Sequence, residues 1–374
     1  MWLHRLYEQD TAFFKKGKVN LLYGSRRVGK TALIERLLKI TSEKVFTGNG
    51  DDIQLRRVLN SEDKTKILSS FQDYDFIFID EAQRISKIGW GLKILVDNFP
   101  AKTIIASGSS SFKLTSQVGA PLTGRSITNM LFPVSVAELK AQFGGMQILQ
   151  NIEHYLISGM YPEVLVNTSI KGKISYLHEL KNAYLLKDIL EIENIRNSDK
   201  LYDLLRLLSY QIGNEVSLNE LGNSLQLSKQ TVARYLDLLE KAFIIKRIGG
   251  YSGNLRKEVT KTYRYYFYDN GVRNAIVNNF NLIEDRNDIG MLWENFMVME
   301  RLKKQHYNKL FSNNYFWRTY DKKEVDFVEE RDGKLYGYEF KWNPKKTKIQ
   351  QEWLDTYPNA TFEIINRDNF LKFY

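Results

Sequence analysis

Eight consecutive residues near the amino terminus have the types and spacing of a loop that binds phosphate. The glycines allow backbone angles that turn successive N–H groups toward an anion, and a helix beginning at Lys30 adds the positive end of its dipole. Lys30 can reach the terminal phosphates of a nucleotide, and the Thr31 hydroxyl is a ligand for Mg²⁺. This Walker A spacing predicts that ATP binds here with Mg²⁺. The loop residues are Gly24, Ser25, Arg26, Arg27, Val28, Gly29, Lys30 and Thr31.

Two acidic residues follow a run of apolar residues in the manner of a Walker B segment. Asp80 and Glu81 come directly after residues 76–79, which are Phe-Ile-Phe-Ile. We expect Asp80 to hold the Mg²⁺ through water and Glu81 to act as general base on the attacking water. Acidic residues also end strands without any catalytic role, and the phosphate loop upstream is what favours the catalytic interpretation.

Two further polar groups are candidates for contacts with the transferring phosphate. Ser109 or Ser110 lies in a serine-rich segment after the apolar run 103–106, where a sensor of the γ-phosphate would stand. Arg125 is a candidate arginine finger that stabilises the transferring phosphate. A serine-rich turn and a loop salt bridge are the plain alternatives. The sequence does not say whether Arg125 acts in its own subunit or on a neighbour.

The apolar patterns around these residues predict a parallel sheet covered by helices. Residues 18–23, 76–79 and 103–106 are continuous apolar runs, which is typical of strands buried on both faces. The apolar spacing over 31–40 predicts a helix directly after the phosphate loop. We therefore expect an α/β fold class, with a P-loop NTPase domain at the amino terminus.

The middle of the chain has the element order of a winged helix-turn-helix. Helical patterns over 217–225 and 228–242 are joined by two residues, and strands over 243–248 and 263–268 flank a basic loop. Winged helices bind nucleic acid, and they also serve as packing modules between proteins. The candidate nucleic-acid contacts are Lys229, Gln230 and Arg234 on the second helix and Arg256 and Lys257 on the wing.

The carboxy-terminal part contains a second candidate site, of the PD-(D/E)xK nuclease type, in a small α/β restriction-endonuclease-like domain. A helix over 291–304 precedes strands over 324–328 and 335–342, and the alternation of the second strand places its acidic and basic residues on one face. Carboxylates in this constellation bind Mg²⁺, and the lysine positions or activates the attacking water. Such residues are also kept for structural pairing alone. The constellation consists of Glu294, Asp326, Glu339 and Lys341.

Together these motifs resemble those of a prokaryotic family of AAA-type ATPases joined to a carboxy-terminal domain of unknown function. The segments similar to its ATPase motifs are 23–31, 78–83, 108–111 and 123–125. Segments that resemble landmarks of the companion domain are 159–163, 268–273 and 293–295. Met160 stands in place of a usual glycine and Asn270 in place of a small residue. The resemblance covers nearly the whole chain, implies ATP binding and hydrolysis, and leaves the physiological task open.

Composition and charge limit the remaining choices. The chain has 374 residues, with 54 Lys and Arg against 44 Asp and Glu, and no cysteine. The formal charge of +10 suits an anionic partner such as DNA or RNA, and it equally suits a basic soluble protein without one. No apolar run approaches the roughly 20 residues that span a bilayer, and the charged amino terminus is unlike a signal peptide. We therefore expect a cytoplasmic protein with no membrane partner.

A chain of this length is expected to form several domains. The boundaries we predict give an ATPase domain over 1–145, a helical region with the winged helix over 146–275 and a nuclease-like domain over 276–374. The first hypothesis is an ATPase whose nucleotide state moves the other two domains on nucleic acid. The alternatives are a nucleotide-dependent regulator that acts through protein contacts and an ATP-gated, Mg²⁺-dependent nuclease. A homo-oligomer or a partner protein is compatible with all three.

Overall fold

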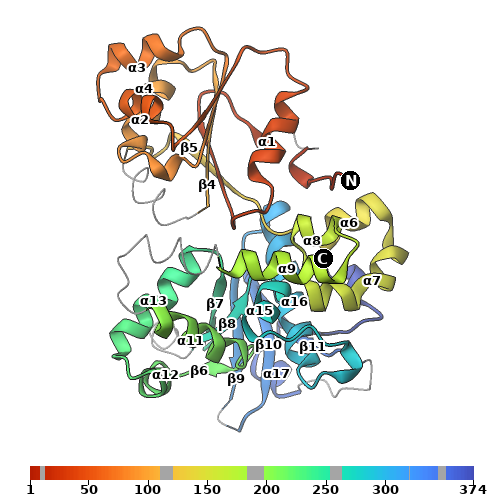
Figure 1. Cartoon of the computed structure of the whole chain (residues 1–374). Helices are drawn as coiled ribbons and strands as arrows, with labels where there is room; N and C mark the ends of the chain where they lie inside the picture. Colours follow the sequence, from red (N-terminus) through yellow and green to blue (C-terminus); the bar gives the residue numbers. More distant parts are fainter. Residues whose placement is uncertain (9–12, 110–120, 183–197, 253–262, 320, 344–350) are drawn as a thin grey trace. The chain divides into compact units, whose positions relative to one another are not determined.

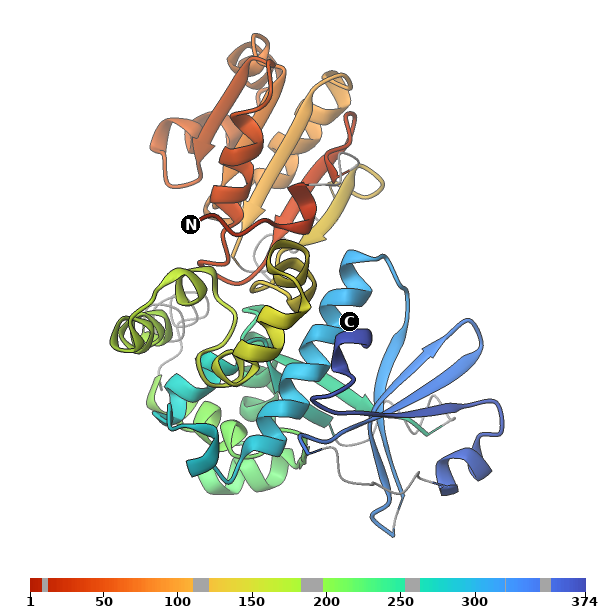
Figure 2. The same ribbon diagram turned by 90° about the vertical axis from the view of Figure 1, so that its right-hand side faces the viewer.

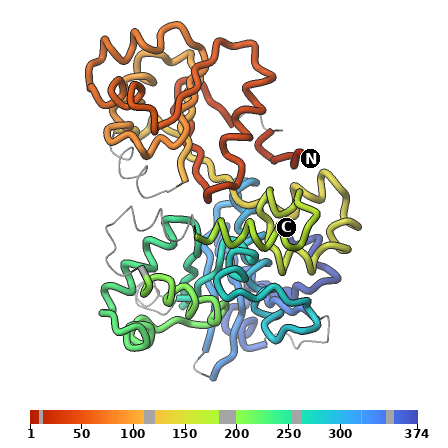
Figure 3. The backbone as a smooth tube through the Cα atoms, viewed as in Figure 1, coloured from red at the N-terminus to blue at the C-terminus, as the bar shows by residue number. Residues whose placement is uncertain are grey.

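The chain divides into two compact units in the computed structural model. The N-terminal unit comprises Trp2–Pro133 with Lys241–Phe243, and the C-terminal unit comprises Val134–Glu240 and Ile244–Tyr374 with Met1. The division into three domains that the sequence predicts remains a prediction. The structure describes residues 1–8, 13–109, 121–182, 198–252, 263–319, 321–343 and 351–374, which are coloured in Figure 3.

The N-terminal unit is built on a five-stranded sheet in the order β2-β3-β4-β1-β5, with all neighbouring strands parallel. This confirms the parallel α/β sheet predicted from the apolar runs. Strands β1, β3 and β4 are buried along their whole length, because helices cover both faces of the sheet. The strands are β1 Val19–Tyr23, β2 Val45–Asn49, β3 Phe76–Asp80, β4 Thr103–Gly108 and β5 Ser126–Met130.

Helix α1 lies on one face of this sheet, and α2, α3 and α4 lie together on the other (Figure 1). The crossovers put the carboxyl ends of β1, β3 and β4 side by side, since Tyr23 pairs with Gly108 in parallel register. In parallel α/β sheets this edge is where ligands bind. The helices are α1 Lys30–Leu38, α2 Ile53–Leu59, α3 Lys64–Phe71 and α4 Ile88–Asn98.

The C-terminal unit contains a seven-stranded mixed sheet in the order β12-β11-β10-β9-β7-β8-β6. Parallel pairing of β7 with β9, at Gly249 and Tyr315, joins the two halves of this sheet. The expected boundary between residues 275 and 276 therefore separates strands that belong to one sheet. The strands are β6 Glu215–Val216, β7 Ile245–Gly250, β8 Tyr263–Phe267, β9 Asn313–Arg318, β10 Glu324–Arg331, β11 Lys334–Phe340 and β12 Thr361–Ile365.

The longest helix that the structure describes in this unit, α16, contacts strands β8 and β11 and lies beside the sheet in Figure 2. Two of the shorter helices begin at serine caps: Ser135 forms a capping box with Glu138, and Ser217 accepts a hydrogen bond from the Glu220 N–H. The helices are α6 Val136–Phe143, α7 Gly145–Ser158, α8 Pro162–Val166, α9 Ile170–Lys181, α11 Ser198–Ser209, α12 Leu218–Leu225, α13 Lys229–Lys241, α15 Asn270–Val277, α16 Ile289–Tyr307 and α17 Gln351–Thr356.

The landmark segments of the companion domain meet around the buried carboxylate of Asp269. Asp269 accepts hydrogen bonds from the backbone N–H of Met160 at 2.6 Å and of Val272 at 3.1 Å, so it caps α15 and fixes the start of α8. A Cβ at Gly159 would lie 2.1 Å from Asp269 Oδ1, so a glycine is required there. Asn270 Oδ1 accepts a hydrogen bond from Asn295, and these landmarks therefore stabilise the fold.

No helix in the described part of the chain is both long enough and apolar enough to cross a membrane.

Candidate functional site

The phosphate loop leads from β1 into α1 and uses left-handed backbone at two glycines. Gly24 has φ of 151°, and a Cβ there would lie 2.0 Å from the carbonyl oxygen of Leu131. Gly29 has φ of 96° directly before the first turn of α1. Residues that carry a Cβ are strained at such positive φ angles, whereas glycine is not. Of the other loop residues, the structure buries Ser25 and Val28, half-buries Arg26 and exposes Arg27.

The ammonium group of Lys30 is folded back onto the loop. Lys30 Nζ donates hydrogen bonds to the carbonyl oxygens of Gly24 at 2.8 Å and Ser25 at 2.9 Å. Burial lowers the pKa of Lys30 to about 8, although the nearby Glu81 and Asp80 carboxylates oppose that shift. The group is therefore a desolvated cation whose hydrogen-bond acceptors are neutral.

Arg5 supports the loop from a segment that the sequence did not connect with the site. Its guanidinium donates to the carbonyl oxygens of Val28 at 2.8 Å and Phe132 at 2.7 Å, and the residue is only 3% exposed. An isolated arginine in the amino-terminal segment carries no local pattern that could have predicted this contact. It is a positioning residue, because it fixes the backbone of the loop.

Thr31 and Asp80 contact each other at the carboxyl edge of the sheet. Thr31 Oγ1 donates to Asp80 Oδ2 at 2.6 Å, and the Ser107 hydroxyl donates to Asp80 Oδ1. A hydroxyl and a carboxylate side by side are oxygen donors of the kind that Mg²⁺ prefers, with phosphate and water completing its shell. These two residues therefore fit the Mg²⁺ that accompanies a nucleotide. Ser107, at the end of the buried strand β4, was not predicted.

Glu81 adopts a left-handed conformation, with φ of 48°, at the turn after β3. Gln83 Nε2 donates to Glu81 Oε2 and, at 3.2 Å, to Ser109 Oγ. Ser109 Oγ also lies 3.5 Å from Glu81 Oε2. The structure thus brings the predicted residues Glu81 and Ser109 together through Gln83, which the sequence interpretation missed. Ser110 lies outside the described residues.

Arg125 lies at the amino ends of the strands, whereas the phosphate loop lies at their carboxyl ends. It directly precedes β5, and its carbonyl accepts a hydrogen bond from the N–H of Val19, the first residue of β1. The loop follows the last residue of β1, and five residues of strand span about 16 Å. The Arg125 guanidinium pairs with Asp97 of α4 at 2.6 Å, and 40% of the side chain is exposed.

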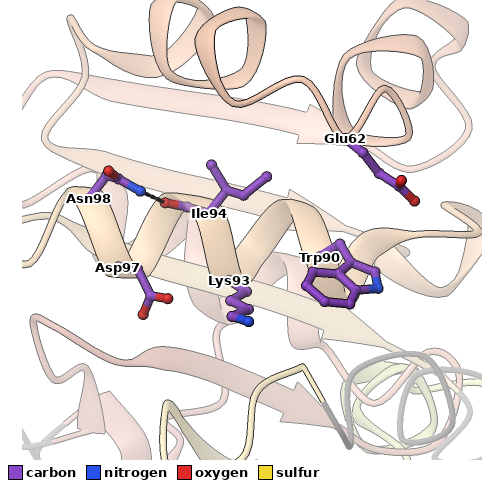
Figure 4. A pocket seen from close by; sticks show the side chains of 6 residues that line it. All are labelled: Glu62, Trp90, Lys93, Ile94, Asp97 and Asn98. Atoms are coloured by element: carbon purple, nitrogen blue, oxygen red, sulfur yellow. Dashed lines mark hydrogen bonds between the residues drawn. The ribbon is translucent and has the colours of Figure 1, made fainter.

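A surface pocket of about 390 Å³ lies along α4, beside the partner of Arg125. Figure 4 shows Trp90, Lys93 and Asp97 projecting from the same side of the helix. Lys93 Nζ stands 4.7 Å from the centroid of the Trp90 ring, which is a cation–π contact. The pocket is separate from the phosphate loop, because it is lined by Glu62, Trp90, Lys93, Ile94, Asp97 and Asn98.

The predicted nuclease residues gather on and beside strands β10 and β11. The antiparallel register, which pairs Phe327 with Tyr338, continues to place Asp326 opposite Glu339. Asp326 Oδ2 accepts a hydrogen bond from the backbone N–H of Phe340 at 2.8 Å. Lys341 Nζ lies 2.6 Å from Glu339 Oε1. The register and these contacts bring Asp326, Glu339 and Lys341 close together.

Glu294 joins them from the first turns of α16. Its Oε1 accepts a hydrogen bond from the Tyr266 hydroxyl at 2.8 Å. Burial, together with the charge of Asp326, raises the pKa of Glu294 to about 8. The same two causes raise the pKa of Glu339 to about 7. We call Glu294, Glu324, Asp326 and Glu339 the carboxylate cluster.

A metal ion does not fit the carboxylate cluster as it stands. Among the residues that the structure describes, no group of three or more His, Asp or Glu side chains is arranged to hold one. The guanidinium of Arg264, on β8, lies among these carboxylates instead, with Nη1 at 3.7 Å from Glu294 and 3.8 Å from Asp326. Sequence reasoning missed Arg264, since β8 is distant in the chain.

The candidate nucleic-acid residues on α13 are exposed. Lys229, Gln230 and Arg234 lie on its outer face, while Val232 and Tyr235 are buried beneath. The wing residues Arg256 and Lys257 lie outside the described residues.

Three regions of the chain match known families. Residues 16–140 match an AAA domain, residues 149–282 a domain of unknown function (DUF8612), and residues 289–365 a domain of unknown function (DUF4143). The N-terminal region is therefore P-loop ATPase-like, which suggests ATPase activity and the use of a nucleotide, usually with Mg²⁺.

Several proteins are similar over most of their length, and all are named as uncharacterized. Rv2008c of Mycobacterium tuberculosis is 26% identical over 332 residues, which cover 87% of this chain and 70% of the relative. MJ1544 of Methanocaldococcus jannaschii is 24% identical, with 83% and 72% covered. A Haemophilus influenzae protein is 23% identical, with 86% and 81% covered.

Two solved structures resemble the chain only weakly. The structure of Drosophila ORC bound to AT-rich DNA and Cdc6 has a TM-score of 0.25 at 11% identity, covering 70% of this chain and 85% of that one. The protein VC1899 from Vibrio cholerae has a TM-score of 0.17 at 11% identity, covering 87% and 88%. Similarity at this level carries no argument about fold or function.

Proposed function

We propose that the chain is an ATPase that binds ATP with Mg²⁺ at the loop Gly24–Thr31. One observation carries this proposal: Lys30, Thr31 and Asp80 converge at the carboxyl edge of the parallel sheet. The Lys30 ammonium is desolvated and bonded only to neutral carbonyls among the acceptors named above, so phosphate oxygens would provide the missing negative charge. The match of residues 16–140 to an AAA domain supports the same function.

Each residue of the site has a role that its position supports. Lys30 binds the terminal phosphates, and Thr31 and Asp80 hold the Mg²⁺. When bound, Mg²⁺ neutralises charge on the phosphate oxygens. Glu81 takes the proton of the water that attacks the γ-phosphorus as the bond to the ADP oxygen breaks. Ser109 acts with Gln83 to orient Glu81, since Gln83 donates a hydrogen bond to the Glu81 carboxylate and to Ser109, which itself lies 3.5 Å from that carboxylate.

Arg125 belongs to this proposal only through a second copy of the chain. Its position before β5 is about a strand length from the phosphate loop of its own sheet. The guanidinium there is paired with Asp97 and 40% exposed, so a neighbouring molecule could reach it. We therefore assign the arginine-finger role in trans, which makes ATPase activity dependent on protein concentration.

The test compares wild type with Lys30→Ala and Glu81→Gln in nucleotide-binding and ATPase assays. We expect Lys30→Ala to weaken binding, and Glu81→Gln to bind ATP but hydrolyse it on the order of 100-fold more slowly. Glu35→Gln, exposed on α1, and Lys39→Ala, exposed directly after it, are matched controls that keep wild-type activity. The proposal fails if wild type binds no nucleotide, or if both site variants hydrolyse ATP like wild type.

We further propose that nucleotide state is coupled to nucleic-acid binding through α13. The element order α11, β6, α12, α13, β7, β8, with β8 between β6 and β7, supports a winged helix. The exposed Lys229, Gln230 and Arg234 support α13 as the helix that meets DNA or RNA. Because β7 also pairs with β9, the wing continues into the sheet that carries the carboxylate cluster.

Salt dependence tests this second proposal. Each phosphate contact contributes a log–log slope of about −0.9 in duplex DNA. Lys229→Ala with Arg234→Ala should therefore weaken binding and reduce the slope by about 2. The double variant Lys64→Ala with Lys171→Ala removes two exposed charges elsewhere and should leave binding unchanged. Absence of salt-sensitive binding to DNA or RNA would instead favour the regulator that acts through protein contacts.

A further inference from the structure

Arg264 is a fully buried arginine in the second half of the chain, on strand β8. The residue is 1% exposed. A buried guanidinium is costly unless carboxylates or other acceptors compensate its charge. What surrounds Arg264 therefore indicates what the carboxylate cluster is built to hold.

Three carboxylates face the guanidinium. Arg264 Nη2 donates to Glu324 Oε2 at 2.7 Å, while Nη1 lies 3.7 Å from Glu294 Oε1 and 3.8 Å from Asp326 Oδ1. These residues come from β10 and α16, whereas Arg264 comes from β8, so the pairing joins three elements. The arginine thus pairs with two of the residues, Glu294 and Asp326, that would ligate a metal in a nuclease of the PD-(D/E)xK type.

An aromatic ring supports the guanidinium from β9, which lies between β7 and β10 in the sheet. Arg264 Cζ stands 4.5 Å from the centroid of the Phe316 ring. Stacking of this kind suits a planar guanidinium and fixes its orientation. The position of the Arg264 guanidinium is therefore fixed both by its ion pairs and by stacking on the Phe316 ring.

The cluster nevertheless keeps an unused acceptor. Glu339 is 5% exposed, and its Oε2 has no hydrogen-bond partner in the described part of the protein. The other oxygen of Glu339 pairs with Lys341. A divalent ion would find oxygen ligands here, but it would stand beside a guanidinium that already engages Glu294 and Asp326.

We propose that Arg264 is a resident counter-ion that excludes divalent metal from the carboxylate cluster, and that removal of its charge converts the cluster into a divalent-cation site. The inference is independent of the ATPase proposal, because every residue in it belongs to the C-terminal unit. It makes the nuclease-like tail metal-free in the wild-type chain. Arg264 then determines whether this tail can perform Mg²⁺-dependent cleavage at all.

The experiment titrates Mn²⁺ into the full-length chain without nucleotide and follows bound Mn²⁺ by electron paramagnetic resonance. We expect wild type and Arg264→Lys, which keep the cation, to show no site that Asp326→Asn removes. Arg264→Met should bind one Mn²⁺ at least tenfold more tightly than wild type, and should lose it when Asp326→Asn is added. Arg318→Met, which removes a guanidinium paired with Glu215 in the same unit, is the matched control.

Arg264→Met also predicts a melting temperature that rises with Mn²⁺, an effect that wild type and Arg318→Met lack. The proposal is overturned if wild type binds a Mn²⁺ that Asp326→Asn removes, or if folded Arg264→Met binds Mn²⁺ no more tightly than wild type. Should Arg264→Met not fold even with Mn²⁺, the wild-type comparison decides alone: a site sensitive to Asp326→Asn contradicts the proposal, and its absence supports it.

Discussion

Each unit of the protein buries a cation, and the two cations differ in their surroundings. Lys30 donates to two carbonyl oxygens of its own loop, and burial lowers its pKa to about 8. Arg264 is as well buried, and burial alone would lower its pKa too. A neighbouring phenol and three carboxylates outweigh burial, however, and raise the pKa of Arg264 above its ordinary value.

The difference indicates which site is prepared for a charged ligand. A buried cation with neutral acceptors gains most when an anion arrives, because the anion replaces the hydration that burial removed. A buried cation among carboxylates is already compensated and has little to gain. The phosphate loop is thus receptive to an anion, whereas the carboxylate cluster is closed to a cation.

Neutralising the two cations should affect stability very differently. We expect Arg264→Met to lower the free energy of unfolding of its unit by about 3–5 kcal/mol at pH 7, because the ion pairs of a buried guanidinium are lost. Lys30→Met should change the stability of its unit by less than about 1 kcal/mol, or increase it, because a desolvated charge is removed. Hydrogen exchange of the amides of β8 and β1 reports the two units separately. Equal losses in both variants would contradict the comparison.

Nucleotide should stabilise the unit that contains the phosphate loop and not the unit that contains the carboxylate cluster. At a hundredfold excess over the dissociation constant, ATP with Mg²⁺ should stabilise the N-terminal unit by about 2.7 kcal/mol. Slower hydrogen exchange in β1 and α1 would measure this effect, and Lys30→Met should lose it. Mg²⁺ without nucleotide should leave exchange in β10 and β11 unchanged, because Arg264 already compensates their carboxylates. Protection of β10 by Mg²⁺ alone would show that the cluster is open.

The carboxylate cluster should make the C-terminal unit less stable as pH rises. Burial, aided by Asp326, raises the pKa of folded Glu294 to about 8, while an unfolded glutamate titrates near 4.3. The folded state therefore binds more protons, so the stabilisation is complete below the unfolded pKa and is lost as pH rises through about 8. We expect a loss of about 4 kcal/mol between pH 5 and pH 8.5, measured by urea denaturation.

Glu294→Gln should flatten this pH dependence, because the amide keeps the neutral form at every pH. Glu284→Gln, which changes an exposed glutamate before α16, should keep the wild-type slope. If Glu294→Gln also keeps that slope, then Glu294 is not the group that binds the additional proton.

The two sites also differ in how far the sequence could predict them. The phosphate loop is contiguous, and the parallel sheet that brings Asp80 to Thr31 follows from buried apolar runs such as Phe76–Ile79. Its local features were therefore readable. The contacts of Arg5, Gln83 and Ser107 were missed, because they depend on packing between segments that have no common pattern.

The carboxylate cluster could be predicted from the sequence only in part. Alternation along β11 predicts Glu339 on the face opposite Tyr338 and Phe340, because strand periodicity is local. Arg264 could not be found this way, because its approach depends on the parallel pairing of β7 with β9. Such pairing between segments far apart in the chain is set by tertiary packing, and without Arg264 the carboxylates look like metal ligands.

Proton uptake on ATP binding is the smallest of the expected effects. It measures directly how the surroundings of Lys30 differ from those of Arg264. With a pKa of about 8, Lys30 in the free protein is half neutral at pH 8. ATP phosphates should restore its full charge, so binding should take up about half a proton at pH 8 and almost none at pH 6.5. Isothermal titration calorimetry in buffers of different ionisation enthalpy measures this number. Lys39→Ala should behave like wild type, and binding enthalpies independent of buffer at pH 8 would contradict the lowered pKa. Arg264 gives no such signal, because its charge is fixed across this range of pH.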